Sequence, residues 1–178
     1  KFCKKNFRWK KKNLNLVVTT TQKTHLKNIN KLNFESFEFN NKIFDNNIVK
    51  KIETSDYILV SIPPINGEDI VIKNFNKNLK KIKNCKWITY LSATSVYGDH
   101  SGQWVTEDSV TKPSSPNGVN RLNAENSWKN FSAKYNLPLQ IFRLAGIYSN
   151  EYNILKRLKL GEVKVVNKKN HFFSRIHV

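Results

Sequence analysis

The chain has 178 residues, of which 39% are hydrophobic and 12% aromatic, which fits one globular domain with a core and excludes a disordered chain. Its formal net charge of +18 comes from lysines spread along the whole chain, without a zinc-finger, recognition-helix or RNP-type motif. The charge therefore does not favour nucleic acid as a partner, although a basic nucleic-acid binder stays open as an alternative.

Short apolar runs and helical stripes alternate along the chain, which is typical of the α/β class. In chain order the pattern predicts strands over 14–20 and 34–39, a helix over 43–52, a strand over 57–62, a helix over 68–82, a strand over 87–92, a helical stripe over 124–135, a strand over 139–144 and a short helix over 152–158. Strands that alternate with helices predict a parallel sheet with helices on both faces, in a Rossmann-like order.

The cysteines and histidines indicate neither a disulfide nor a metal site. Cys3 and Cys85 form no CxxC pair and are interpreted as free thiols of a reducing compartment, and the four histidines are too scattered for a metal site. No apolar run reaches membrane-spanning length, and no charged-then-apolar leader is present. We therefore expect a soluble cytoplasmic protein with no membrane partner.

The segment 89–100, Thr-Tyr-Leu-Ser-Ala-Thr-Ser-Val-Tyr-Gly-Asp-His, is the most informative part of the chain. An apolar β-rich run leads into small hydroxyl residues and then a Val-Tyr-Gly turn. The hydroxyls therefore lie at the carboxyl end of a buried strand, which is where open α/β sheets bind ligands. The later stripe at Ala124, Trp128, Phe131 and Tyr135 predicts core packing, and Glu125 and Arg143 are expected to pair or cap within the fold.

Four blocks of sequence, with 59–64 ending the strand before them, carry a resemblance to a known family. The blocks are 90–100, 121–128 (Arg-Leu-Asn-Ala-Glu-Asn-Ser-Trp), 141–148 (Ile-Phe-Arg-Leu-Ala-Gly-Ile-Tyr) and 173–178 (Phe-Ser-Arg-Ile-His-Val). Their order and spacing resemble the extended short-chain dehydrogenase/reductase superfamily, in particular its atypical NAD-dependent epimerase/dehydratase-like proteins. The resemblance implies an α/β fold with a Rossmann-like doubly wound parallel sheet and an NAD(P) cofactor.

The glycine-rich turn of that family is missing from this sequence. In the family, a first strand and this turn bring the backbone close to the cofactor pyrophosphate. None of the six glycines here is in such an arrangement. The resemblance therefore implies that 1–178 is a partial NAD(P)-binding Rossmann-like domain, a fragment whose substrate-side elements continue beyond it. The absent strand would lie between 14–20 and 57–62, so these strands either keep unpaired edges or close up, and we expect poor stability and little NADPH binding.

The catalytic positions of the family are only partly matched. In the family a Tyr transfers a proton, a Lys four residues later lowers its pKa, and a Ser or Thr holds the substrate oxygen. Aligning Arg121 with that Lys places Asn117 at the Tyr position, and an amide has no proton to give at neutral pH. Ala93 stands at the hydroxyl position, between Ser92 and Thr94. The catalytic candidates are therefore Ser92, Thr94, Asn117 and Arg121, with Tyr97 or Tyr148 as alternative phenols.

The resemblance also implies cofactor-binding and substrate-binding residues. An acidic residue after the second strand would bind the ribose 2′-hydroxyl of NAD, but this turn carries no carboxylate, which slightly favours NADP unless the turn is simply solvated. The cofactor-binding candidates are Thr20, Gln22, Lys23, Ser61, Ile62, Pro63, Ala145 and Gly146. The substrate-binding candidates are Tyr97, Asp99, His100 and Tyr148.

These features lead to two functional hypotheses besides the nucleic-acid binder. The first is a fragment of an NAD(P)-dependent oxidoreductase, epimerase or dehydratase that acts on a nucleotide sugar or a similar polar carbonyl or hydroxyl substrate. The second is an NAD(P)-binding but catalytically silent sensor or interaction protein of the same fold, which Asn117 and Ala93 favour. Whether the chain is an enzyme is left open by its sequence.

Overall fold

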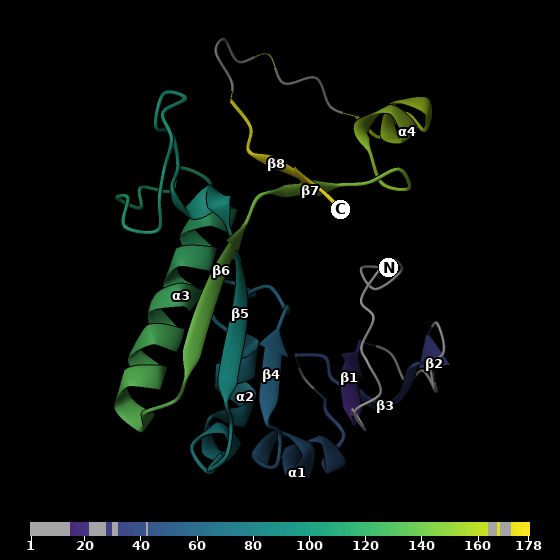
Figure 1. Ribbon diagram of the computed structural model, residues 1–178, viewed down its shortest axis with the longest axis vertical. Coiled ribbons are helices and arrows are strands. Elements are labelled where there is room, and N and C mark those ends of the chain that lie inside the picture. Colours follow the sequence, from purple (N-terminus) through teal and green to yellow (C-terminus); the bar gives the residue numbers. More distant parts are fainter. Residues whose placement is uncertain (1–14, 22–27, 30–31, 42, 164–166, 168–171) are drawn as a thin grey trace. The chain divides into compact units, whose positions relative to one another are not determined.

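The computed structural model describes residues 15–21, 28–29, 32–41, 43–163, 167 and 172–178 (Figure 1). The described residues fall into two compact units, one within 1–55 and 77–84 and the other within 56–76 and 85–178. The strands form three separate sheets, one in the first unit and two in the second. None of the helices in the described part of the chain is both long and apolar enough to cross a membrane.

The described part of the first unit is a small sheet followed by a helix, together with residues 77–84. Strand β1 (Leu16–Thr20) pairs in parallel with β3 (Leu32–Glu38), and β2 (Asn28–Ile29) pairs antiparallel with the start of β3. Helix α1 (Asn47–Glu53) follows. Phe37, Phe39 and Ile48 are buried, so the aromatic residues at the end of β3 supply much of this unit's core.

The second unit is built on a parallel sheet in the order β4-β5-β6. Its strands are β4 (Tyr57–Val60), β5 (Trp87–Ala93) and β6 (Leu139–Leu144). Helix α2 (Ile70–Leu79) follows β4, a 3-10 turn (Thr94–Val96) follows β5, and α3 (Pro116–Tyr135) leads to β6. Strand β7 (Gly146–Tyr148) and strand β8 (Arg175–His177) form a separate parallel pair on either side of α4 (Ile154–Lys159). The α/β class with parallel strands is thus confirmed.

Helix α3 is defined at both ends by capping residues. The Ser115 side chain accepts a hydrogen bond from Gly118 N at 3.1 Å, and Pro116 occupies the first helical position. The helix ends at Asn136, which adopts the left-handed conformation typical of a C-cap. Ala124 and Trp128 are fully buried, as the stripe predicted, and Figure 1 shows α3 alongside β6.

A buried hydrogen-bond network joins the start of α2 to α3. Asp69 Oδ1 accepts hydrogen bonds from Val71 N at 3.0 Å and Ile72 N at 2.9 Å, which caps α2. Its other oxygen accepts the indole N–H of Trp128 at 2.8 Å. Burial raises the pKa of Asp69 above its usual range, although these hydrogen bonds and the charge of Arg121 oppose the shift.

The predicted elements differ from the observed ones mainly at their boundaries. Strand 139–144 matches β6, whereas the strand predicted over 57–62 ends at Val60, before the pair Pro63 and Pro64 that cannot donate backbone hydrogen bonds. The helix predicted from 43 begins only at Asn47, because Phe44 instead bridges to Phe39. Leu14 lies outside the described residues, and β1 and β4 belong to different sheets.

Replacing Asp69 by Asn tests the buried carboxylate through the pH dependence of stability. Because the folded-state pKa is raised, the folded chain binds more protons than the unfolded chain between the usual value of 3.8 and the raised pKa. The free energy of unfolding therefore falls as the pH rises through this window. We expect the stability advantage of the native chain over Asp69→Asn to shrink as the pH rises from about 4 to 7.

Urea denaturation followed by circular dichroism measures this difference. Asp108→Asn, in an exposed loop, is the control and should change stability by less than about 0.5 kcal/mol. A stability advantage of the native chain over Asp69→Asn that grows with rising pH would contradict a raised pKa of Asp69.

Candidate functional site

The carboxyl ends of β4, β5 and β6 lie at one edge of the sheet in the second unit. The register pairs Val60 with Tyr90 and Ala93 with Leu144, and all three strands are parallel. The residues that follow them, beginning with Ser61, Thr94 and Ala145, therefore leave the sheet on the same side. This edge is the candidate site.

Residues 89–100, called the hydroxyl segment below, pass from extended backbone into a tight turn. Ser92 is buried, and Ala93 is still extended before the 3-10 turn over Thr94–Val96. The turn then requires a glycine at position 98, because the φ of Gly98 is +72° and a Cβ there would lie 1.9 Å from the carbonyl oxygen of Lys112. The turn therefore places Ser92 and Thr94 at the edge of the sheet.

The first turns of α3 pack directly against this segment. A Cβ at Gly118 would lie 2.6 Å from the carbonyl oxygen of Ser95, so the helix start that carries Asn117 touches the 3-10 turn. Arg121, one helical turn further on, donates Nη1 to the carbonyl oxygen of Leu91 at 2.7 Å. The structure thus brings Asn117 and Arg121 to the hydroxyl segment, with Asn117 exposed and Arg121 half-buried.

The loop after β4 approaches the same helix. Ser61, Ile62 and Pro63 leave the strand, and a bridge between Ile65 and Glu68 closes the loop. A Cβ at Gly67 would lie 3.6 Å from Oδ1 of Asn120, the residue before Arg121. The loop that the resemblance assigns to the cofactor therefore lies beside α3.

Ala145 and Gly146 link the sheet to the β7–β8 pair. Gly146 N donates to the carbonyl oxygen of Ser174 at 3.0 Å. Further along β7, the ring of Tyr148 stands edge-on to His177 with centroids 5.0 Å apart. Tyr148 lines a cleft of about 230 Å³ together with Arg157 and Arg175.

The remaining substrate candidates make contacts within the fold. Tyr97 is buried, with its ring centroid 4.7 Å from the guanidinium carbon of Arg143. Asp99 accepts a hydrogen bond from Ser101 N at 2.8 Å, and His100 Nε2 lies 3.1 Å from the carbonyl oxygen of Val110. These contacts organise the loop after β5, so binding of substrate by Tyr97, Asp99 or His100 remains a prediction.

The cofactor candidates at the end of β1 belong to the first unit. Thr20 is the last residue of β1, and its carbonyl oxygen accepts a hydrogen bond from Phe39 N at 2.8 Å. Gln22 and Lys23 lie outside the described residues. The slight preference for NADP stays a prediction.

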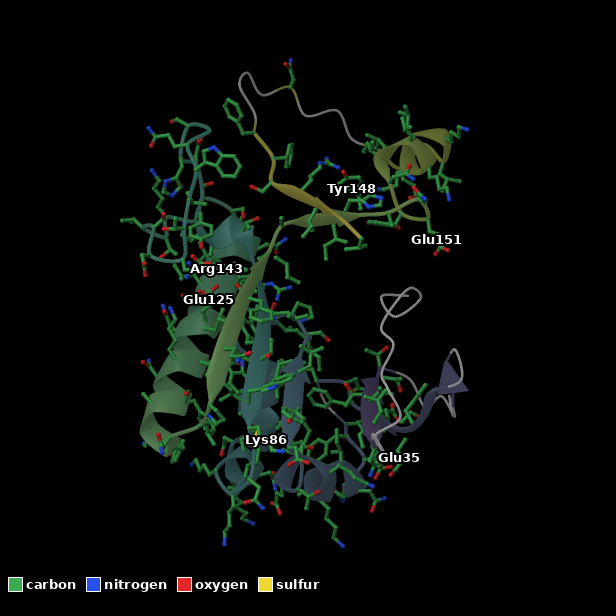
Figure 2. The ribbon with its side chains drawn as sticks, in the orientation of Figure 1. Glu35, Lys86, Glu125, Arg143, Tyr148 and Glu151 are labelled. Carbon is green, nitrogen blue, oxygen red and sulfur yellow. The ribbon has the colours of Figure 1, made fainter. Side chains whose placement is uncertain are left out.

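A buried ion pair joins α3 to β6, as Figure 2 shows. Nη2 of Arg143 lies 2.8 Å from Oε2 of Glu125, and Nε of Arg143 lies 3.1 Å from Oε1. Glu125 is fully buried and raises the pKa of Arg143 above its usual value. The predicted pair is confirmed, and it lines an open cleft of about 440 Å³ with Tyr97, Glu107 and Lys129.

Tyr90 is the residue at this edge that the sequence analysis missed. It lies two positions before Ser92 on β5 and is fully buried. Burial raises its pKa, while the nearby charge of Arg121 and a hydrogen bond with the Arg121 side chain oppose the shift. The alternation of Tyr90 and Ser92 along the strand was the available signal, since both side chains must share one face.

A scan against protein-family models found no match, and neither did a search of curated proteins. Among solved structures, the chain is similar to a functionally unknown conserved protein from Silicibacter pomeroyi, with 29% identity, a TM-score of 0.74 and coverage of 92% of this chain and 55% of that chain. A UDP-N-acetylglucosamine 4-epimerase from Methanobrevibacter ruminantium, in complex with UDP-N-acetylmuramic acid, is 18% identical with a TM-score of 0.66, covering 92% of this chain and 68% of that one.

A UDP-glucuronic acid 4-epimerase from Bacillus cereus, in complex with UDP-glucuronic acid and NAD, is 24% identical with a TM-score of 0.52. Here the match covers 65% of this chain and 40% of the other. At these identities the epimerases establish the fold alone. The chain spans about half the length of the first two structures in the search, 55% and 40%.

Replacing Glu125 by Gln tests the buried ion pair. The substitution leaves the Arg143 guanidinium with no carboxylate partner in a largely buried position, so we expect the free energy of unfolding to fall by about 3–5 kcal/mol. Urea denaturation measures the loss. Lys129→Gln is the matched control, because Lys129 lies 4.0 Å from the same carboxylate but is half-exposed, and it should cost less than about 1 kcal/mol. Equal losses of unfolding free energy in Glu125→Gln and Lys129→Gln would contradict the prediction that the Arg143 contact contributes more than the Lys129 contact.

Proposed function

We propose that this chain supplies the nicotinamide side of the site in an NAD(P)-dependent oxidoreductase, epimerase or dehydratase. Its substrate would be a nucleotide sugar or a similar polar molecule with a reacting carbonyl or hydroxyl group. The observation that carries the proposal is the meeting of three elements at one sheet edge. Arg121 of α3 binds the carbonyl oxygen of Leu91 on β5, the start of α3 packs against Ser95, and the loop after β4 lies beside Asn120 of α3.

The cofactor would be held mainly by backbone and by one charged side chain. The backbone of Ser61, Ile62 and Pro63 would run along the cofactor, and the small residues Ala145 and Gly146 would let the nicotinamide ring approach. Arg121 uses Nη1 to bind Leu91, so its other N–H groups could reach a ribose hydroxyl or a phosphate oxygen. The bound cofactor would supply hydride-transfer chemistry, and the protein would supply orientation and charge.

The substrate oxygen would lie at the end of β5. Ser92 and Thr94 are the hydroxyl residues at that position, and each can donate a hydrogen bond to a carbonyl oxygen or accept one from an alcohol. The comparisons support this substrate class, since two of the similar structures hold UDP-linked sugars or amino sugar derivatives, and one of these also holds NAD. We also propose a cytoplasmic location, based on the unpaired cysteines of the sequence.

A cofactor-binding but catalytically silent protein is the second candidate. Asn117 is exposed at the start of α3, at the place where the family carries its proton-transferring Tyr, and Ala93 stands in place of the family's Ser or Thr. Neither side chain can transfer a proton at neutral pH. A site of this kind would bind cofactor and report its presence without turnover.

Titration of the ¹⁵N-labelled chain with NADP⁺ and with NAD⁺ tests cofactor binding. Because the sequence has no glycine-rich phosphate turn, we expect weak binding, with Kd of about 1 mM or higher. NMR cross peaks of Ser61, Ile62, Thr94, Arg121 and Gly146 should shift together along one binding curve. Shifts confined to other residues at saturation would exclude this edge as the cofactor site.

Installing the family's phenol and hydroxyl distinguishes the active and silent candidates. The double variant Asn117→Tyr with Ala93→Ser is incubated with NAD⁺ and UDP-glucuronic acid, and formation of NADH or of a new UDP-sugar is followed. Turnover by the native chain would favour the active candidate, and turnover by the variant alone would favour the silent one. Asn123→Tyr, an exposed position on the same helix, is the control and should leave the rate unchanged. Turnover by neither chain, with cofactor bound, would count against the proposed reaction class.

A further inference from the structure

The outer edge of β6 is an open edge of the sheet in the second unit. Among the described strands, β6 pairs only with β5, and its six residues, Leu139–Leu144, include neither lysine nor proline. The strand at the opposite edge, β4, has only four residues. Natural proteins protect open edges by keeping them short or by placing lysine or proline there, because an unprotected edge pairs with another strand. We therefore expect a further strand to cover β6.

Helix α3 leaves this edge accessible, because it packs mainly on β5. The Trp128 ring stacks on the ring of Tyr90 in β5, with centroids 6.2 Å apart. Ile141 and Phe142 both line the cleft of about 440 Å³, although successive residues of a strand point to opposite faces. The cleft therefore runs along the outer edge of β6, where the Phe142 side chain is 51% exposed.

Two oppositely charged side chains, Glu107 and Lys129, line this cleft at different levels. Nη1 of Arg143 donates to the carbonyl oxygen of Glu107 at 3.3 Å, so Glu107 lies near the carboxyl end of β6. Lys129 follows Glu125 by one helical turn, and Figure 1 shows α3 and β6 running in opposite directions. Because Glu125 binds Arg143, Lys129 lies nearer the amino end of the strand. Glu107 and Lys129 are both exposed.

We propose that the β6 edges of two copies of this chain pair antiparallel about a two-fold axis, with the two Phe142 residues opposite each other. Residues opposite each other in an antiparallel pair point to the same face, so the two Phe142 rings are neighbours. The axis reverses the strand direction, so Glu107 of one copy lies at the level of Lys129 of the second copy. This charge complementarity favours a second copy as the strand that covers β6. The inference goes beyond the proposed function, which needs no second copy.

Sedimentation velocity of the whole chain over a range of concentrations tests the dimer. We expect a species of twice the 20.8 kDa of one chain, which dissociates on dilution. Phe142→Lys places two lysines opposite each other at the axis and should weaken the dimer by about tenfold or more. Because Phe142 is largely exposed, this variant should fold, and circular dichroism verifies that it does.

Leu155→Lys is the matched control, since Leu155 is an exposed apolar residue of α4 outside the cleft. It should leave the dimer unchanged. A native chain that stays monomeric at every concentration, as it would if β6 were covered by another part of a longer chain, would overturn the proposal. So would a dimer that Leu155→Lys removes and Phe142→Lys keeps.

Charge reversal tests the two ion pairs across the axis. Glu107→Lys alone should weaken the dimer about tenfold, because two lysine pairs then face each other. Adding Lys129→Glu restores opposite charges across the axis, so the double variant should recover most of the native affinity. The native dimer should also weaken as NaCl is added. Native affinity in Glu107→Lys, or no recovery in the double variant, would overturn the proposal.

Discussion

The parallel pairing of β5 with a strand on each side determines where the polar groups of the second unit lie. Because β4, β5 and β6 run in one direction, every segment that leaves a strand does so at the same edge. β5 extends beyond β4, since Tyr90 is opposite the last residue of β4 and Ser92 and Ala93 follow it. The hydroxyl residues Ser92 and Thr94 therefore lie beyond the end of β4 and close to α3.

Much of the second unit could be predicted from the sequence, because its strands are short apolar runs bounded by turn residues. The sequence predicts β6 to the residue, and of the two roles it leaves open for Glu125 and Arg143, pairing and capping, the structure shows pairing. The start of α1 is misplaced because Phe44 has helical spacing to Ile48 and Ile52 but instead bridges to Phe39. The spacing of apolar residues alone cannot distinguish a residue that packs in a helix from one that packs in the turn before it.

The contacts that sequence reasoning could not supply are those between residues far apart in the chain. Asp69 and Trp128 are 59 positions apart, and nothing near either residue marks the other as its partner. Tyr90 was hidden for a different reason. A buried aromatic residue in a strand is usually core, and only the three-dimensional structure shows that the Arg121 guanidinium lies near its hydroxyl.

The ion pair between Glu125 and Arg143 has a further consequence for the geometry of α3. Glu125 follows Arg121 by one helical turn, so both side chains leave the helix on nearly the same side. A slide of the helix by one turn would carry Arg121 about 5.4 Å along its axis and away from Leu91. The two hydrogen bonds between Arg143 of β6 and the Glu125 carboxylate oppose such a slide, because Glu125 would then face a different residue of β6. The ion pair between Glu125 and Arg143 thereby fixes the position of the Arg121 guanidinium along β5.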